Sequence, residues 1–332
     1  MTALSLKSFK FRRERERSWR ELESLVNRAE RGGVKALSET DRLRLPILYR
    51  GALSSLSVAR AISLDRALLD YLEALCQRAY FVVYGPRQSA RTAIWRFLSV
   101  RFPATVRRYA GAVLLAGLFL VAGGLAGYLL TNADPERYYS FVPDGMAQGR
   151  DPTATTEFLR DGLYDQGTTQ SALATFSAFL FTHNAKVGML CFAIGFAAGI
   201  PVFILLFQTG LMLGAFSWLY MSRGLGIDWW GWVLPHGVTE LLAVVLCGAG
   251  GLAMAKALVF PGRLRRLDAL ARVGREAAVI VAGAVLMFFI AGLLEGFFRQ
   301  MVTDPATRYA VVFLTAAFWL SYFTLAGRRG AA

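Results

Sequence analysis

The spacing of apolar residues divides the chain into two parts. Residues 1–109 mix apolar and charged positions, whereas long uncharged apolar runs recur from residue 110 onward. A helix of about 20 apolar residues crosses the hydrocarbon core of a bilayer. The runs predict six spans, at 110–130, 187–207, 211–227, 233–257, 277–298 and 309–326. We therefore predict an all-α, polytopic helical membrane protein whose six-helix transmembrane domain covers residues 110–327.

Local signals set the expected boundaries of these spans. Gln208-Thr209-Gly210 is typical of a tight polar turn between the second and third spans. Pro235 is expected in the first turn of the fourth span, where a proline loses no hydrogen bond. The three tryptophans before it (Trp229, Trp230 and Trp232) suggest a membrane-interface belt. Within the long loop at 131–183, apolar positions at helical spacing (Leu173, Phe176, Phe179 and Leu180) predict an amphipathic helix, on the outer surface or dipping in beside the spans.

The N-terminal part has the pattern of a small helical domain. Apolar positions three and four apart predict helices over 10–31, 38–62 and 64–83, the second with an optional break near Pro46. No strand-like alternation competes with this pattern. We assign residues 1–88 to a cytoplasmic helical domain.

The segment 89–109 combines aromatic and basic residues and precedes the first span. Trp95, Phe97 and Phe102 alternate with five arginines, Arg91, Arg96, Arg101, Arg107 and Arg108. An amphipathic helix of this kind lies in the headgroup layer, where its arginines contact anionic lipid. The alternative is an ordinary helix packed on its neighbours.

Charge predicts the orientation of the chain. Among 332 residues with net charge +14, residues 1–109 hold 22 Lys/Arg against 10 Asp/Glu, and 262–276 hold five arginines against two acids. The chain ends near Arg328-Arg329, whereas the loop at 131–183 holds seven acids and three arginines. Six spans place all three basic regions on one side. The positive-inside rule then predicts a multi-pass protein of the cell inner (cytoplasmic) membrane, with both termini cytoplasmic and the loop at 131–183 extracytoplasmic.

Composition also limits the partners. The excess of basic residues indicates anionic lipid rather than nucleic acid, because it collects on one side of the first span and no nucleic-acid motif occurs. The N-terminus lacks the apolar core of a signal peptide. The three cysteines form no CxxC pair, so neither a disulfide framework nor a metal site is indicated. No cofactor is expected.

Polar residues collect at one predicted depth in the outer half of the membrane. His236 and Glu240 are four apart and share a helix face. The predicted intramembrane polar cluster comprises Asn184, Lys186, His236, Glu240 and Glu295, with His183 beside it. Ionisable residues inside spans are costly and often functional. The cluster could hold helices in register, line a path for a proton, an ion or a lipid headgroup, or support intramembrane hydrolysis.

Catalytic motifs are absent from the sequence. A zinc-protease helix needs HExxH, whereas HGVTE supplies one histidine and one carboxylate. No GxSxG elbow, P-loop or Rossmann fingerprint occurs. We therefore assign no catalytic residue and expect no enzyme.

Two segments resemble a known family. They read HNAKVGMLCFAIGFAAGIPVFILLFQTGLMLGA (183–215) and LPHGVTELLAVVLCGAGGLAMA (234–255). They resemble the stage II sporulation protein M family, with matches at Asn184, Gly195, Gly199, Pro235, His236, Gly237 and Glu240, and at Glu295 in a later segment. The sequence departs from the family pattern at residues 208–210, where asparagine-glycine is more usual. The long N-terminal part is similar to that of longer members found outside spore formers.

The resemblance implies an integral membrane protein without established catalytic activity. We therefore predict a non-enzymatic scaffold that acts in assembly or remodelling of the cell envelope. Its partners would be membrane lipids and proteins of the membrane or envelope, with homo-oligomerisation possible and no nucleic acid. The alternative is a transporter or channel subunit whose outer-leaflet cluster lines an ion or lipid path. An intramembrane hydrolase is a third, weaker interpretation.

Overall fold

The computed structural model describes residues 3–62, 66–84, 90–164, 170–298 and 301–328. Every regular element in these ranges is helical. The chain forms two compact units, Met1–Ala93 and Ile94–Ala332, and each is described by itself.

The first unit consists of three long helices. They are α1 (Ala3–Gly32), α2 (Glu39–Ile62) and α3 (Arg66–Tyr84), with a short 3₁₀ turn, η1 (Val34–Ala36), after α1. Their apolar stripes meet in one core, which includes Trp19, Leu22, Val26, Leu45, Tyr49, Ala52, Leu68, Leu72 and Leu75. Two ion pairs at the rim, Arg28–Asp41 at 3.0 Å and Arg78–Glu30 at 2.6 Å, connect α1 with the other two helices.

The optional break at Pro46 is not present, because α2 runs through this residue. An internal proline removes one backbone hydrogen bond. Here Leu45, Tyr49 and Ala52 around it are all buried in the core of the first unit. Tertiary packing therefore holds the helix together across the proline.

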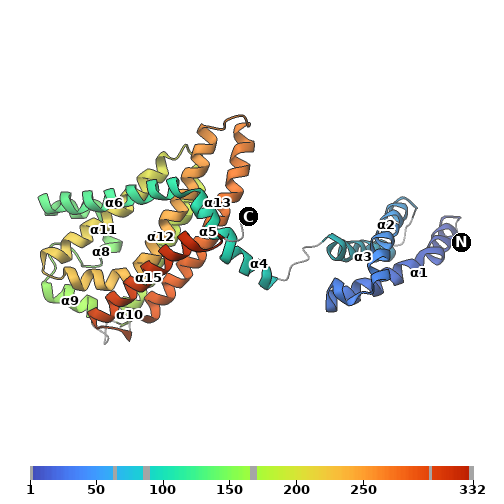
Figure 1. The fold of residues 1–332 in the computed structure, drawn as a ribbon, viewed down its shortest axis with the longest axis horizontal. Helices are drawn as coiled ribbons and strands as arrows, with labels where there is room; N and C mark the ends of the chain where they lie inside the picture. Colours follow the sequence, from blue (N-terminus) through green and yellow to red (C-terminus); the bar gives the residue numbers. More distant parts are fainter. Residues whose placement is uncertain (1–2, 63–65, 85–89, 165–169, 299–300, 329–332) are drawn as a thin grey trace. The chain divides into compact units, whose positions relative to one another are not determined.

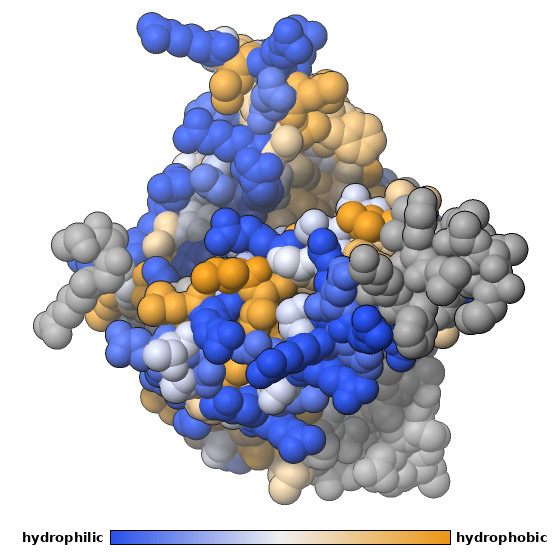
Figure 2. Space-filling model, turned by 90° about the vertical axis from the view of Figure 1, so that its right-hand side faces the viewer, coloured by the Kyte–Doolittle hydropathy of each residue, from blue (hydrophilic) through white to orange (hydrophobic). Residues whose placement is uncertain are grey.

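The face of the molecule seen in Figure 2 is mostly hydrophilic, with hydrophobic side chains gathered in patches. In the first unit, exposed apolar side chains include Ile47 on α2 and Phe81 and Tyr84 on α3. Apolar atoms make up a large share of the surface of any folded protein that faces water.

The second unit is built from long apolar helices. They are α6 (Ala110–Ala133), α10 (Gln170–Ala193), α11 (Ile200–Ser222), α12 (Gly226–Val259), α13 (Arg266–Leu293) and α15 (Pro305–Leu325). Over the described residues, five helices are long and apolar enough to cross a membrane: α6, α11, α12, α13 and α15. Helix α12 lies in the middle, with α10, α13 and α15 packed beside it (Figure 1). The second unit is therefore the membrane-spanning part of a multi-pass protein.

Helices α6 and α11 pack through glycines spaced four apart. A Cβ atom on Gly123 would lie 2.2 Å from the carbonyl oxygen of Phe207, and one on Gly214 would lie 2.0 Å from that of Gly124. Gly127 and Gly210 meet backbone at similar distances. The two backbones therefore touch directly, as small residues permit in membrane helices.

The predicted boundary between the second and third spans was wrong. Residues 208–210 lie inside α11, where the Thr209 hydroxyl donates to the Leu205 carbonyl at 2.8 Å. The chain turns instead at residues 194–199, through a 3₁₀ turn, η4 (Ile194–Phe196), and two positive φ angles, 57° at Ala198 and 83° at Gly199. The structure therefore has the helices α10 and α11 in place of the predicted helices 187–207 and 211–227.

The segment after α6, which is predicted to lie outside the cell, folds into a cap over the adjoining ends of α11 and α12. It contains η3 (Pro135–Arg137), α7 (Tyr138–Phe141), α8 (Asp144–Ala147) and α9 (Thr156–Tyr164). Its apolar residues share a core with the adjoining ends of α11 and α12. The expected loop at 131–183 thus ends where α10 begins, at Gln170. The side chains of the amphipathic helix predicted there, from Leu173 to Leu180, lie outside the described residues.

The prediction that the three tryptophans form a membrane-interface belt was wrong for two of them. Trp229 and Trp232 are 5% and 3% exposed, and Trp229 stacks on Tyr220 with ring centroids 4.4 Å apart. The cap covers the surface that these rings would otherwise present to the membrane interface. The expected helix start at Pro235 was also wrong, because α12 begins at Gly226 and contains this proline.

The segment before α6 forms α4 (Ala90–Arg96), the π-helical turn η2 (Phe97–Arg101) and α5 (Phe102–Arg108). Phe102 is 2% exposed and packs edge-on against Phe323 of α15, at 5.4 Å. A Cβ atom on Gly283 of α13 would collide with the Phe102 ring, at 2.2 Å. The expected aromatic face in the headgroup layer was therefore wrong for Phe102, and the packing alternative describes α5. Trp95, on α4, is 70% exposed.

Candidate functional site

One face of α12 carries a continuous stripe of aromatic and ionisable residues. Trp229, Trp232, His236 and Glu240 are three or four apart, so they lie above one another on the helix. Trp232 meets the His236 ring edge-on, with centroids 6.1 Å apart. His236 is 4% exposed. The stripe therefore leads from the aromatic core beneath the cap into the membrane-spanning part of α12.

The stripe ends at a buried carboxylate that contacts two other elements. Glu240 is 2% exposed and accepts a hydrogen bond from the Asn184 side chain of α10. Glu295 is also 2% exposed and lies close enough to act on Glu240 electrostatically. Within the described part of the chain, Glu240 Oε1 has no hydrogen-bond partner. Such a group is costly unless something compensates it.

Glycines bring α10 close enough to make this contact. Gly188 follows Asn184 by one turn of α10, and a Cβ atom added to it would be 3.4 Å from Cβ of Cys247 on α12. Two turns further, a Cβ atom on Gly195 would lie 2.5 Å from the Gly251 carbonyl oxygen. Residue numbers rise together along this contact, from Asn184 and Glu240 to Gly195 and Gly251. Helices α10 and α12 therefore run parallel.

Glu295 belongs to a π-helical turn, η5 (Leu294–Phe298), which continues α13. This turn contacts both α10 and α12. Single π turns often re-aim side chains at functional positions. This π-helical turn therefore places the Glu295 carboxylate in the same buried region as Glu240.

The predicted cluster is thus brought together in part. Asn184, Glu240 and Glu295 meet, and His236 lies one turn away along α12. Lys186 is exposed and acts electrostatically on the half-buried His183.

The predicted lipid-contacting arginines have mixed environments. Arg91, Arg96 and Arg101 are exposed. Arg107 donates to the Phe323 carbonyl of α15 at 2.9 Å, and Arg108 pairs with Glu276 of α13 at 2.9 Å.

Two polar residues of the site region were not identified from the sequence. Thr239 accepts a hydrogen bond from the indole nitrogen of Trp319, at 2.9 Å, which ties α12 to α15. Arg308 is 2% exposed, donates to the Val302 carbonyl at 2.8 Å and lies 5.4 Å from the Tyr164 ring centroid. The signals were present: a threonine beside Glu240 in HGVTE, and a lone arginine at the edge of an apolar run.

The side chains of Asn184, Glu240 and Glu295 can take part in only a few kinds of interaction. Two carboxyl groups and one amide can exchange hydrogen bonds, or hold a proton or a cation between them. Within the described residues, no group of three or more His, Cys, Asp or Glu side chains is placed to bind a metal ion.

These features define a multi-pass helical membrane protein with a buried polar contact between its helices. The chain belongs to the Stage II sporulation protein M family, whose model matches residues 115–299, and this confirms the resemblance seen in the sequence. Residues 9–85 match the model of a domain of unknown function (DUF8413). Neither a curated protein nor a solved structure matches the chain.

Proposed function

We propose that this chain is a non-enzymatic scaffold of the cytoplasmic membrane that acts in assembly or remodelling of the cell envelope. The observation that supports this role most is the burial of the polar cluster. Glu240 is 2% exposed and is bonded to a neighbouring helix. A polar group shared between membrane helices fixes their register and keeps them together. A fixed register suits a rigid platform on which partners assemble.

The same proposal includes six membrane crossings, with α10 as the second. Helix α10 has 24 residues, so it is about 36 Å long, enough for a hydrocarbon core of about 30 Å. It also runs parallel to α12, which is itself long and apolar enough to cross. Six crossings leave both termini and the arginine-rich segment 262–276 in the cytoplasm and the outer cap outside.

Cysteine labelling tests this topology. The three native cysteines are buried, so their background reaction with an impermeant maleimide is low. Thr153→Cys in the outer cap should react in intact cells, and Thr40→Cys in the first unit should react only after permeabilisation, since both threonines are exposed. Labelling of Thr40→Cys in intact cells would contradict the orientation.

Recovery of partners tests the assembly role. The full chain, purified in mild detergent, should bring envelope or membrane proteins with it. Glu240→Gln should lower their recovery, because an amide changes the bond to Asn184. Asp268→Asn, an exposed carboxylate change on α13, should leave recovery unchanged.

A transporter or channel subunit is the second candidate, because Glu240 Oε1 is buried without a hydrogen-bond partner in the described residues. An open acceptor beside a second carboxylate could accept a proton or a cation in transit. Liposomes containing the protein separate the two functions. Proton or cation flux that is lost in a folded Glu240→Gln variant would favour transport, and absence of flux above protein-free liposomes would favour the scaffold.

A further inference from the structure

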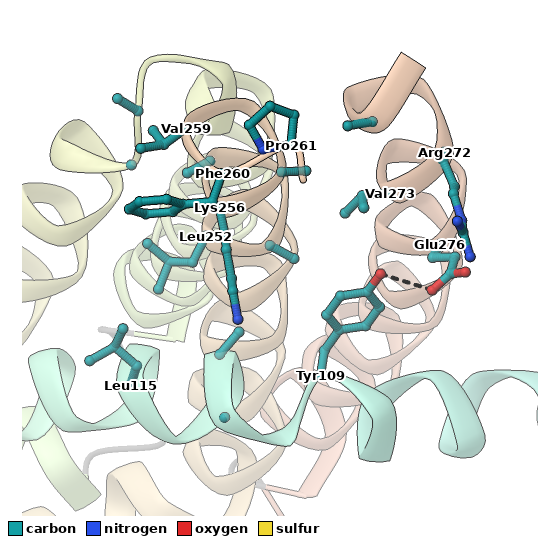
Figure 3. Close-up of a pocket in the computed structure, with 18 of the residues that line it drawn as sticks. Tyr109, Leu115, Leu252, Lys256, Val259, Phe260, Pro261, Arg272, Val273 and Glu276 are labelled. Atoms are coloured by element: carbon teal, nitrogen blue, oxygen red, sulfur yellow. Dashed lines mark hydrogen bonds between the residues drawn. The ribbon is translucent and has the colours of Figure 1, made fainter. Parts of the chain in front are cut away.

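A second polar feature lies at the opposite end of α12, in a pocket of about 910 Å³. Its walls come from the start of α6, the turn before α11, the end of α12 and the start of α13 (Figure 3). Apolar side chains form one part of it, among them Leu115, Phe203 and Leu252. This volume is in the range of sites that hold small molecules.

The polar side chains of this pocket carry a net positive charge. Its charged lining consists of Arg108, Lys256 and Arg272 against Glu276. The Glu276 carboxylate is already engaged, because Arg108 pairs with it at 2.9 Å and the Tyr109 hydroxyl donates to it at 2.8 Å.

Lys256 lies on the wall of the pocket opposite Tyr109 and Glu276. Its side chain extends along the pocket with the amine directed toward α6 (Figure 3). Lys256 is exposed and forms no ion pair with any residue that the structure describes. The pocket is therefore complementary to a negatively charged ligand.

The position along α12 indicates which kind of ligand this is. Lys256 lies 28 residues after Asp228, the charged residue at the other end of α12, or about 42 Å along the helix. Since the hydrocarbon core is about 30 Å thick, Lys256 lies at headgroup depth in the leaflet opposite the outer cap. Leu252, one turn earlier, lies nearer the hydrocarbon.

The mouth of the pocket carries Phe260, which is 75% exposed, next to the exposed Arg263 and Arg265. Exposed apolar and basic side chains side by side are typical of a membrane interface. A ligand with an anionic head and an apolar tail would match both parts of the pocket.

We propose that this pocket binds an anionic glycerophospholipid of the cytoplasmic leaflet. Its phosphate lies beside the Lys256 amine, with Arg272 adding positive charge on the opposite wall, and its acyl chains lie along Leu115, Phe203 and Leu252. The site differs from the arginines predicted on 89–109, of which it shares only Arg108. It rests on the proposed membrane placement and not on the assembly role, so the two can fail separately.

Native mass spectrometry of the full chain in detergent tests this site. The probes are phosphatidylglycerol and phosphatidylcholine with the same acyl chains. The variant Lys256→Gln/Arg272→Gln removes two charges from the pocket. The matched control Arg266→Gln/Arg275→Gln removes two exposed charges from the same region but none that line the pocket.

The pocket variant should bind phosphatidylglycerol roughly 25-fold more weakly, since each basic side chain contributes about a fivefold factor at an anionic lipid surface. The control should stay within about threefold of wild type, because screened surface charges contribute less. Phosphatidylcholine should bind weakly to all three proteins. Elution as a single species and an unchanged melting temperature would show that the variants are folded.

A second variant tests the apolar half of the pocket. Leu115→Trp narrows it without changing charge, at a side chain that is 40% exposed, and should also weaken phosphatidylglycerol binding. Equal losses in the pocket and control variants would reduce the effect to general surface charge and overturn the proposal. Equal binding of phosphatidylcholine, or competition by free glycerol phosphate as strong as by the intact lipid, would overturn it too.

Discussion

Replacing Gly251 with alanine tests the contact that brings α10 against α12. The added Cβ atom would lie 2.3 Å from the Cys191 carbonyl oxygen. Because that oxygen belongs to a helix backbone, the two helices would have to separate. Overpacking of this kind costs about 1–3 kcal/mol. Separation would also weaken the Asn184–Glu240 hydrogen bond further along the same interface.

The neighbouring glycine provides a matched control. A Cβ atom on Gly250 would be 3.6 Å from the Ala277 Cβ, which is ordinary contact. Alanine in a helix interior is favoured over glycine by about 0.5–1 kcal/mol. Because both variants gain this helix preference, they should differ by the overpacking cost alone, about 1–3 kcal/mol, although they make the same chemical change one residue apart.

Melting followed by tryptophan fluorescence in detergent measures this difference. A domain of 150–250 residues shifts by about 2–4 °C per kcal/mol, so Gly251→Ala should melt about 2–12 °C below Gly250→Ala. Equal melting temperatures, or a higher value for Gly251→Ala, would refute the close parallel packing of α10 on α12.

Two further predictions concern single polar contacts. Thr239→Val should lower stability by about 1–3 kcal/mol, because it leaves the buried Trp319 indole donor unpaired; Thr324→Val, which removes an exposed hydroxyl, should melt like wild type. In the first unit, the Arg78 hydrogen bond holds the pKa of Glu30 below its usual value. The pair therefore stabilises the fold above the unfolded pKa, and this contribution is lost as the pH falls through the folded pKa. The rate at which an aromatic disulfide modifies the buried Cys76 reports opening of this unit. Glu30→Gln should react faster than wild type at pH 6, and the ratio of the two rates should fall as the pH is lowered through the folded pKa of Glu30; a constant ratio would contradict the assignment.

Hydropathy predicted the helical class and the apolar segments well, because burial in lipid demands long apolar runs. It placed the second boundary wrongly, because residues 187–207 are apolar throughout and carry no polar interruption. The true turn depends on Gly199 at φ 83° and on the contact of Gly195 with Gly251, which only the packed helices reveal. Residues 208–210 look like a turn, but Thr209 satisfies its hydroxyl within its own helix.

The candidate site was predictable where it depended on helix periodicity. His236 and Glu240 follow from four-residue spacing, and Glu295 from its place in an apolar run. Their neighbours depend on tertiary structure. Trp229 and Trp232 are buried because the cap formed by α7, α8 and α9 folds over them, and no local pattern distinguishes that from a lipid-facing belt.

Co-purification from mild detergent, measured for wild type and Glu240→Gln, tests the proposed scaffold role most directly. The account predicts that wild type recovers a reproducible set of membrane or envelope proteins, that Glu240→Gln recovers clearly less of the same set, and that Asp268→Asn matches wild type. Recovery of the chain alone, or equal recovery by all three proteins, would contradict it.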